Sequence, residues 1–178
     1  MIKRIIGGAI ALAIGGTVFA VSQSDIVSNF SKNTGMTQEQ AENYINNISE
    51  SDLASFSEVG QDFIEDGNWY LDGARDIDCV NYTYEWETYS LSCQSGKSQL
   101  QKIGSDEIKL GNCYKSLDTD LGDAVKSKIN ECVSDIDTVN ADFNFPIVTA
   151  LMDATTITDL KNTNIYNKSI LQSALESE

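Results

Sequence analysis

Between residues 53 and 74, the chain repeats a pattern that restricts its fold more than any other feature. Seven apolar or small residues follow one another at alternating steps of three and four, which is the spacing of one face of an α-helix. The series consists of Leu53, Phe56, Gly60, Phe63, Gly67, Tyr70 and Ala74. It predicts a long helix that packs on a second helix, with Gly60 and Gly67 allowing a close approach. Asp66-Gly67-Asn68 is also a sequence that can end a helix early, so the length of this helix stays open.

The helical period returns twice more, and the two stripes are separated by a short turn. The first stripe is Leu100, Ile103, Leu110, Tyr114 and Leu117, and the second is Leu121, Val125, Ile129, Cys132, Ile136, Val139 and Phe143. Matched stripes joined by a short connection predict an antiparallel helix pair. Shorter helices are expected near residues 24–32, from Thr37 onward and after Pro146. Thr37 with Gln40 and Thr156 with Asp159 have the spacing of helix N-terminal caps.

One segment in the middle of the chain has a different period. Val80, Tyr82, Tyr84 and Trp86 alternate with polar residues, and the alternation resumes after a turn near residues 85–88. Aromatic and β-branched residues at a period of two predict a two-stranded β-hairpin near residues 79–93. The fold class expected is therefore mainly α, with α+β character from one inserted hairpin. We expect a compact helical bundle of about five to seven helices.

The four cysteines point to two disulfides. Four cysteines allow three connectivities. Cys79 and Cys93 bracket the predicted hairpin, and Cys113 and Cys132 lie at similar distances on either side of the turn near residue 122. We therefore predict the pairs Cys79–Cys93 and Cys113–Cys132, although a hairpin turn of two or four residues would place the first pair on opposite faces. No Cys-x-x-Cys spacing and no histidine are present, which argues against a zinc site or a redox pair.

The N-terminus has the order of an export signal. Lys3 and Arg4 precede an uncharged run over residues 5–21, and cleavage after Ala20 would leave small residues, Ala20 and Val18, at positions −1 and −3. The alternative is an uncleaved membrane anchor formed by residues 5–21. Residues 1–20 are thus expected to be a signal peptide or signal anchor, and residues 21–178 a single acidic, mostly helical domain. Both interpretations place that domain outside the cytoplasm: periplasmic or secreted if the signal is cleaved, membrane-anchored and extracytoplasmic if it is not.

Charge and composition exclude several classes of function. The chain has 27 acidic and 12 basic residues, a net charge of −15, and no histidine. Binding to nucleic acid is disfavoured because phosphates would be repelled. Catalysis by Ser-His-Asp or Cys-His arrangements is excluded because it requires histidine. The sequence assigns no catalytic residue, no cofactor and no metal ligand, and no family resemblance contributes to these expectations.

Glu107 is the one carboxylate whose position stands out. It interrupts the apolar stripe between Ile103 and Leu110. A carboxylate buried there would have a raised pKa and would be a candidate acid catalyst. The more common arrangement, and the one expected here, is a side chain at the edge of the stripe that reaches water or a lysine such as Lys109 or Lys128.

Aromatic residues form the candidate partner-binding surface. Tyr82, Tyr84 and Trp86, with Trp69 and Tyr70 before them, have the composition of a stacking platform for a sugar or a partner. The alternative, which is the more common one, is an aromatic face that covers the helices and stabilises the hairpin.

An acidic turn resembles the start of a calcium loop without matching it. Asp118, Asp120, Gly122 and Asp123 resemble the start of such a loop. Counted from Asp118, however, position 5 is Gly122 in place of an oxygen ligand, the glycine comes one place early, and position 12 is Ile129. A polar turn between two helices is the simpler interpretation.

These observations predict an exported cell-envelope protein without enzymatic activity, which binds an unidentified protein or envelope component or has a structural role. Two alternatives stay open. One is an envelope hydrolase that uses carboxylates around Glu107, and the other is a weak calcium-binding protein.

Overall fold

Seven α-helices dominate the part of the chain that the structure describes. The structure is a computed structural model of the full chain, and it describes residues 9–14, 17–48, 55–117 and 124–177. The helices are α1 (Gln23–Thr34), α2 (Gln38–Asn46), α3 (Phe56–Asp76), α4 (Cys93–Ser116), α5 (Val125–Asp142), α6 (Pro146–Leu151) and α7 (Ala154–Glu176). The 3-10 helix η2 (Glu85–Tyr89) and the strands β1 (Ala9–Ile14) and β2 (Thr17–Ser22) complete the elements.

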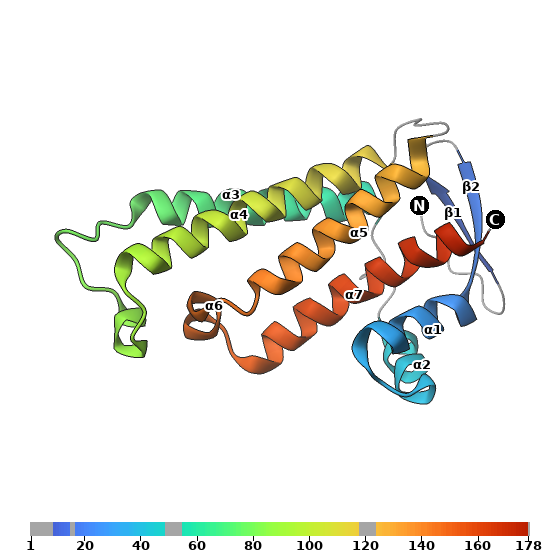
Figure 1. Ribbon diagram of the computed structural model, residues 1–178, viewed down its shortest axis with the longest axis horizontal. Helices are drawn as coiled ribbons and strands as arrows, with labels where there is room; N and C mark the ends of the chain where they lie inside the picture. The colour runs from blue at the N-terminus through green and yellow to red at the C-terminus, as the bar shows by residue number, and fades with distance from the viewer. Residues whose placement is uncertain (1–8, 15–16, 49–54, 118–123, 178) are drawn as a thin grey trace.

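The four long helices are aligned roughly along the molecule (Figure 1). α3 packs against α4, α4 against α5, and α5 against α7, while α1 packs against α7 at one end. The strands, α1 and α2 lie at that end, and η2 and α6 lie at the opposite end (Figure 1). The predicted class, mainly α with a small β element, is confirmed.

The β element is not where the sequence placed it. The antiparallel pair is β1 with β2, in register from Ala9 opposite Ser22 to Ile14 opposite Thr17. β2 lies against α1 and α7, and its Phe19 and Val21 are buried. Among the described residues no helix is long and apolar enough to cross a membrane. Export and cleavage after Ala20 stay predictions.

The predicted hairpin at residues 79–93 is wrong, because local hydrogen bonds replace the strand ladder there. The Asp78 carboxylate accepts hydrogen bonds from the backbone N–H groups of Val80, at 2.9 Å, and Asn81, at 3.2 Å. The Asp78 N–H in turn donates to the Tyr84 hydroxyl, at 2.7 Å. Side chains that bind nearby backbone groups compete with regular secondary structure. The segment is therefore a loop that leads into η2.

Side-chain caps fix where the helices begin. The box predicted at Thr37 and Gln40 is confirmed, with the Gln40 N–H donating to Thr37 Oγ1 and the Gln40 side chain accepting from the Thr37 N–H. The cap predicted at Thr156 is wrong, because α7 begins one turn earlier. The Asp153 carboxylate accepts from the N–H groups of both Thr155 and Thr156, at 2.9 Å each.

α3 is continuous through Gly67, and its glycines meet glycines of α4. A methyl group added to Gly60 would lie 2.6 Å from the Gly111 carbonyl oxygen, and one added to Gly67 would lie 2.6 Å from that of Gly104. Real carbon atoms do not approach so closely, so each position accepts only glycine at this helix separation. The close approach predicted for α3 is therefore confirmed. The matching seven-residue spacing of Gly104 and Gly111 is the signal that identifies its partner.

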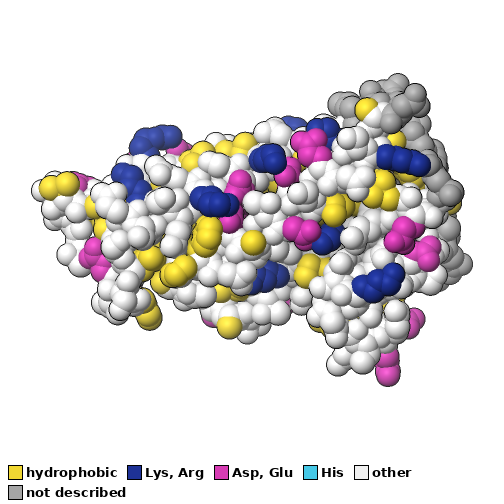
Figure 2. Space-filling view, in the orientation of Figure 1, with side chains coloured by type: hydrophobic (Ala, Val, Ile, Leu, Met, Phe, Trp, Pro, Cys, Tyr) yellow, Lys and Arg dark blue, Asp and Glu magenta, His cyan; other side chains and the backbone are white. Residues whose placement is uncertain are grey.

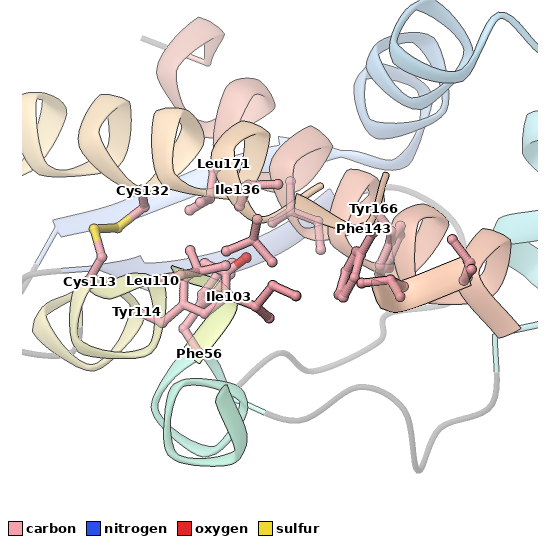
Figure 3. Packing of buried hydrophobic residues seen from close by; sticks show 14 of the residues in the cluster. Phe56, Ile103, Leu110, Cys113, Tyr114, Cys132, Ile136, Phe143, Tyr166 and Leu171 are labelled. Atoms are coloured by element: carbon pink, nitrogen blue, oxygen red, sulfur yellow. A yellow bond between two sulfur atoms is a disulfide. The ribbon is translucent and has the colours of Figure 1, made fainter. Parts of the chain in front are cut away.

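Both predicted disulfides are present. Cys113 and Cys132, with Cα atoms 5.5 Å apart, join α4 to α5 beside Leu110, Tyr114 and Ile136 in the core (Figure 3). The Cα atoms of Cys79 and Cys93 lie 5.6 Å apart, and this bridge closes the loop that contains η2. Because that loop is not a hairpin, the difficulty of opposite strand faces does not arise.

Candidate functional site

A pocket of about 570 Å³ lies between α3 and α7. α3 supplies one wall and α7 the other, while Glu107 from α4 and Phe143 at the end of α5 contribute from the elements between them. The lining residues are Val59, Asp62, Phe63, Asp66, Trp69, Tyr70, Glu107, Phe143, Met152, Leu160, Thr163, Asn164 and Asn167. The set combines three carboxylates with mostly aromatic and aliphatic walls.

Glu107 is buried in this pocket, which corrects the expectation that it lies at the edge of its stripe. Its side chain is 3% exposed, and no described group donates a hydrogen bond to Oε2. The lysines expected to reach it bind elsewhere. Lys109 Nζ pairs with Asp135 at 2.7 Å, and Lys128 Nζ pairs with Glu131 at 2.6 Å.

Burial and neighbouring negative charges keep the carboxyl group of Glu107 mostly protonated at neutral pH. Burial first, and then the carboxylates of Asp66 and Asp142, raise the pKa of Glu107 to about 8. Partial burial, and then Asp62 and Glu65, also raise the pKa of Asp66. A cation bound among Asp62, Asp66 and Glu107 would relieve this repulsion and favour the ionised form of Glu107.

No described lysine or arginine neutralises the pocket. Among the described ion pairs none includes Asp62, Asp66 or Glu107, whereas Lys102 pairs with the buried Asp142 and Lys168 with Asp137. In the view of Figure 2 the basic side chains are interspersed with acidic ones over α4, α5 and α7. The pocket therefore holds the negative charges of Asp62 and Asp66, which no ion pair of the described residues offsets.

Aromatic rings form the wall next to these carboxylates. Trp69 and Tyr70 are in edge contact, with ring centroids 5.1 Å apart, and Trp69 is 67% exposed although it lines the pocket. Tyr70 is buried, and its pKa is raised to about 12 by burial first and then by the charges of Glu107 and Asp66. Exposed indole next to carboxylates offers both apolar contact and a face that attracts cations.

The pocket continues toward η2. A second, almost wholly apolar pocket of about 250 Å³ shares Trp69 and Tyr70 with the first, and Tyr84, Trp86 and Leu151 also line it. Of the candidate aromatic surface, Trp69, Tyr70, Tyr84 and Trp86 thus come together, and the Tyr84 and Trp86 rings stack with centroids 4.6 Å apart. Tyr82 does not join them. Its side chain is 67% exposed and lines neither pocket.

The pocket continues in the other direction as well. A third pocket, of about 220 Å³, lies between α2 and α7 and shares Thr163 and Asn167 with the first. Tyr44 and Tyr166 contribute rings to it. The central pocket thus shares lining residues with a pocket on either side, and we call the three together the α3–α7 groove.

One group of the described residues outside this groove has the spacing of metal ligands. The calcium-like turn at residues 118–123 lies outside the described residues. Cys113, Glu131 and Asp135 approach one another within ligand distance. Cys113 is bonded to Cys132, however, and Asp135 is paired with Lys109, so this group is not available to a metal ion.

The sequence interpretation missed the acidic side of the site. Asp62 and Asp66 are four residues apart on α3 and flank the apolar stripe, so a helical projection would have placed them on one face with Trp69. What the projection could not show is that α7 leaves this face open. Comparisons with protein-family models, with curated proteins and with solved structures found no match.

Proposed function

We propose that this protein is a non-enzymatic binding module of the cell envelope, and that the central pocket of the α3–α7 groove, around Glu107, binds a cationic group carried on an apolar body. One observation carries the proposal: the carboxylate of Glu107 is 3% exposed, lacks a hydrogen bond at Oε2 and lines a pocket with aromatic walls. A buried polar atom without a partner is costly to a protein. A ligand that supplies the missing partner would offset this cost.

The surroundings of Glu107 define the chemistry of that ligand. Asp62 and Asp66 add negative charge within the same pocket, which selects a cation over an anion or a neutral group. Phe63, Trp69 and Phe143 supply apolar contact, which selects an amine or guanidinium attached to a hydrocarbon or ring over a bare ion.

The test uses two small probes that differ in charge alone. 2-Phenylethylamine is cationic at neutral pH, and 2-phenylethanol has nearly the same size and shape without the charge. Titration calorimetry at pH 8 is expected to give a dissociation constant of about 1 mM for the amine, as suits a fragment of this size. Binding of the alcohol is expected to be at least about tenfold weaker.

Two substitutions locate the binding. Glu107→Gln keeps the shape of the side chain and removes its charge. It is expected to weaken the binding of 2-phenylethylamine at least about tenfold. Glu39→Gln is the matched control, because Glu39 is an exposed residue of α2 that lines none of the three pockets. Equal affinity for the two probes, or equal weakening by both substitutions, would overturn the proposal.

A second candidate function, a carboxylate-dependent envelope hydrolase, is supported by the same side chain. A carboxyl group in an apolar pocket whose pKa is about 8 is protonated at neutral pH and suited to donate a proton to a leaving group. Asp66 would supply the second carboxylate. In a cell-wall zymogram this hypothesis requires a clearing band that Glu107→Gln abolishes. No band, or a band of equal strength in the variant, rejects it.

We also propose that the protein is exported by its N-terminal segment, as a signal peptide or anchor. Two disulfides are typical of oxidising compartments. Intact-mass spectrometry of the protein from its native source tests both points. Export with cleavage after Ala20 requires the mass of residues 21–178 minus four hydrogens. A full-length mass with free thiols in a cytoplasmic fraction contradicts it.

A further inference from the structure

We infer that the occupant of the α3–α7 groove is a helical segment of a partner protein, with one apolar face and a basic residue near its centre. This inference rests on the proposed function, because it assigns the cation at Glu107 to a side chain of that segment. The first support is the length of the groove. Val59 lines the central pocket and Gly73 the pocket at η2, and the two are separated by about 21 Å along α3. That length is far more than a small amine fills, and it matches four turns of helix.

The second support is the order of chemistry along the groove. The pocket at η2 is apolar and lined by the stacked Tyr84 and Trp86, the centre holds the carboxylate of Glu107, and the pocket at α2 offers Tyr44 and Asn47. A helix that binds in a groove contacts it through side chains spaced three, four and seven residues apart. Apolar anchors on either side of one lysine or arginine fit this order.

The third support comes from exposed side chains at the rim. Trp69 is 67%, Leu151 50% and Leu160 38% exposed, and each lines a part of the groove. Tryptophan is among the side chains that most often dominate binding between proteins, and the two leucines add exposed apolar surface around Trp69.

Charge disfavours a second copy of this chain that would dock through its own α3. α3 carries six acidic side chains and one basic one, Arg75, which pairs with Asp72. Two such helices brought together would repel each other. The complementary partner is a basic segment, and the net charge of −15 would also attract it from a distance.

The probe for this inference is a designed helical peptide of alanine and glutamine, about 16 residues long, whose leucines and single central lysine lie on one face. A first control peptide carries glutamate in place of the lysine. A second has the same composition and charge but a scrambled order. Binding of each fluorescein-labelled peptide to the full chain is measured by anisotropy. The amphipathic peptide is expected to bind at least about tenfold more tightly than 2-phenylethylamine, and both controls at least about tenfold more weakly than the amphipathic peptide.

A matched pair of substitutions separates this inference from the proposed function. Leu151→Ser removes an exposed apolar group from the pocket at η2, and Val80→Ser removes one that is 90% exposed outside the groove. Leu151→Ser is expected to weaken the peptide about fivefold and to leave the amine unchanged, because the amine occupies the central pocket alone. Val80→Ser is expected to change neither.

Each remaining outcome counts against one claim or both. If the amine binds at Glu107 but the peptide binds no more tightly, or the scrambled peptide binds equally well, the helical partner is rejected while the binding module stands. If Leu151→Ser leaves the peptide affinity unchanged, the groove is not its site and the inference is overturned. If neither amine nor peptide binds, both proposals fall.

Discussion

The two faces of α3 differ in how closely the rest of the protein packs against them. On one face, Gly60 and Gly67 lie against the backbone of α4 so closely that a methyl group does not fit. On the other face, Asp62, Asp66 and Trp69 line a groove that no other part of the described chain fills. On the first face, glycines without side chains allow α4 to pack closely. On the second face, large and charged side chains border an open groove.

The difference shows how one helix can combine stability with a binding surface. Close packing along the glycine face contributes dispersion contacts along much of the helix. That stability allows the opposite face to keep side chains that cost free energy, such as the buried carboxylate of Glu107. Function is therefore expected to be sensitive to changes on the open face, and stability to changes on the closed one.

The largest effect is expected from Gly67→Ala. The new methyl group would lie 2.6 Å from the Gly104 carbonyl oxygen and 3.0 Å from the Ile108 nitrogen, so α3 and α4 must move apart. We expect the free energy of unfolding to fall by about 3 kcal/mol, even though alanine is the better helix former. Denaturant unfolding followed by circular dichroism measures it.

Gly73→Ala on the same helix is the control for this comparison. A methyl group at Gly73 meets nothing within 4 Å. Alanine is expected to raise the free energy of unfolding there by about 0.5–1 kcal/mol, because it reduces the entropy of the unfolded chain. Equal stability of the two variants would show that the glycines of the closed face are not required for packing.

On the open face, Glu107→Gln is expected to raise stability in alkaline solution. Since the folded-state pKa of Glu107 is about 8, above its ordinary value of 4.5, the folded protein binds more protons than the unfolded chain between these values. The free energy of unfolding therefore falls as pH rises through this window. At pH 8.5 we expect the variant to be more stable by about 2 kcal/mol, and at pH 4 to show no gain.

Thermal unfolding from pH 4 to 9 provides the comparison. Asp66 and Asp142 also have raised pKa values, but they are present in both proteins, so the difference between the two pH curves reports Glu107. Parallel curves at every pH would contradict the assigned burial.

A smaller effect concerns ligand binding and pH. Because a cation is expected to bind the ionised form of Glu107, the affinity for 2-phenylethylamine should rise by up to about tenfold per pH unit from pH 6 to 8 and then level off. The same titration with Glu107→Gln should be nearly flat. If the wild-type affinity were independent of pH, the cation would not bind to the ionised form of Glu107.

The smallest effect concerns the start of α7, the other wall of the groove. Asp153→Ala removes the acceptor for the N–H groups of Thr155 and Thr156 and is expected to cost about 1 kcal/mol. Asp159→Ala, at the position where the sequence pattern placed a cap residue, should cost less than half as much. Chemical denaturation of both variants decides which residue begins the helix.

Local patterns predicted the helices well and the exceptions have physical causes. The spacing of Gly60 and Gly67 predicted a close helix pair because the constraint is local and repeated. The alternation from Val80 to Trp86 failed because the Asp78 carboxylate binds the backbone N–H groups of this segment and draws it into a turn. A two-residue period alone does not show whether a second strand is available.

The candidate site was less predictable than the fold. Glu107 was recognised as unusual, but whether it reaches solvent depends on how α3, α5 and α7 surround α4. The cysteine pairing was right although the hairpin offered as its reason for Cys79 and Cys93 was wrong. The burial of Glu107 and the approach of Cys79 to Cys93 both depend on packing between distant segments. The pattern of apolar residues along a single helix does not show such packing.

The most direct test of the account is a map of amide chemical shifts on addition of 2-phenylethylamine to the ¹⁵N-labelled full chain. We predict the largest changes on the open side, at Asp62, Asp66, Trp69 and Glu107 and at the facing residues of α7, with little change at Gly60 and Gly111. Small, uniform changes over all acidic surfaces, or changes centred on α1 and α2, would contradict the claim that the open face of α3 is the binding surface.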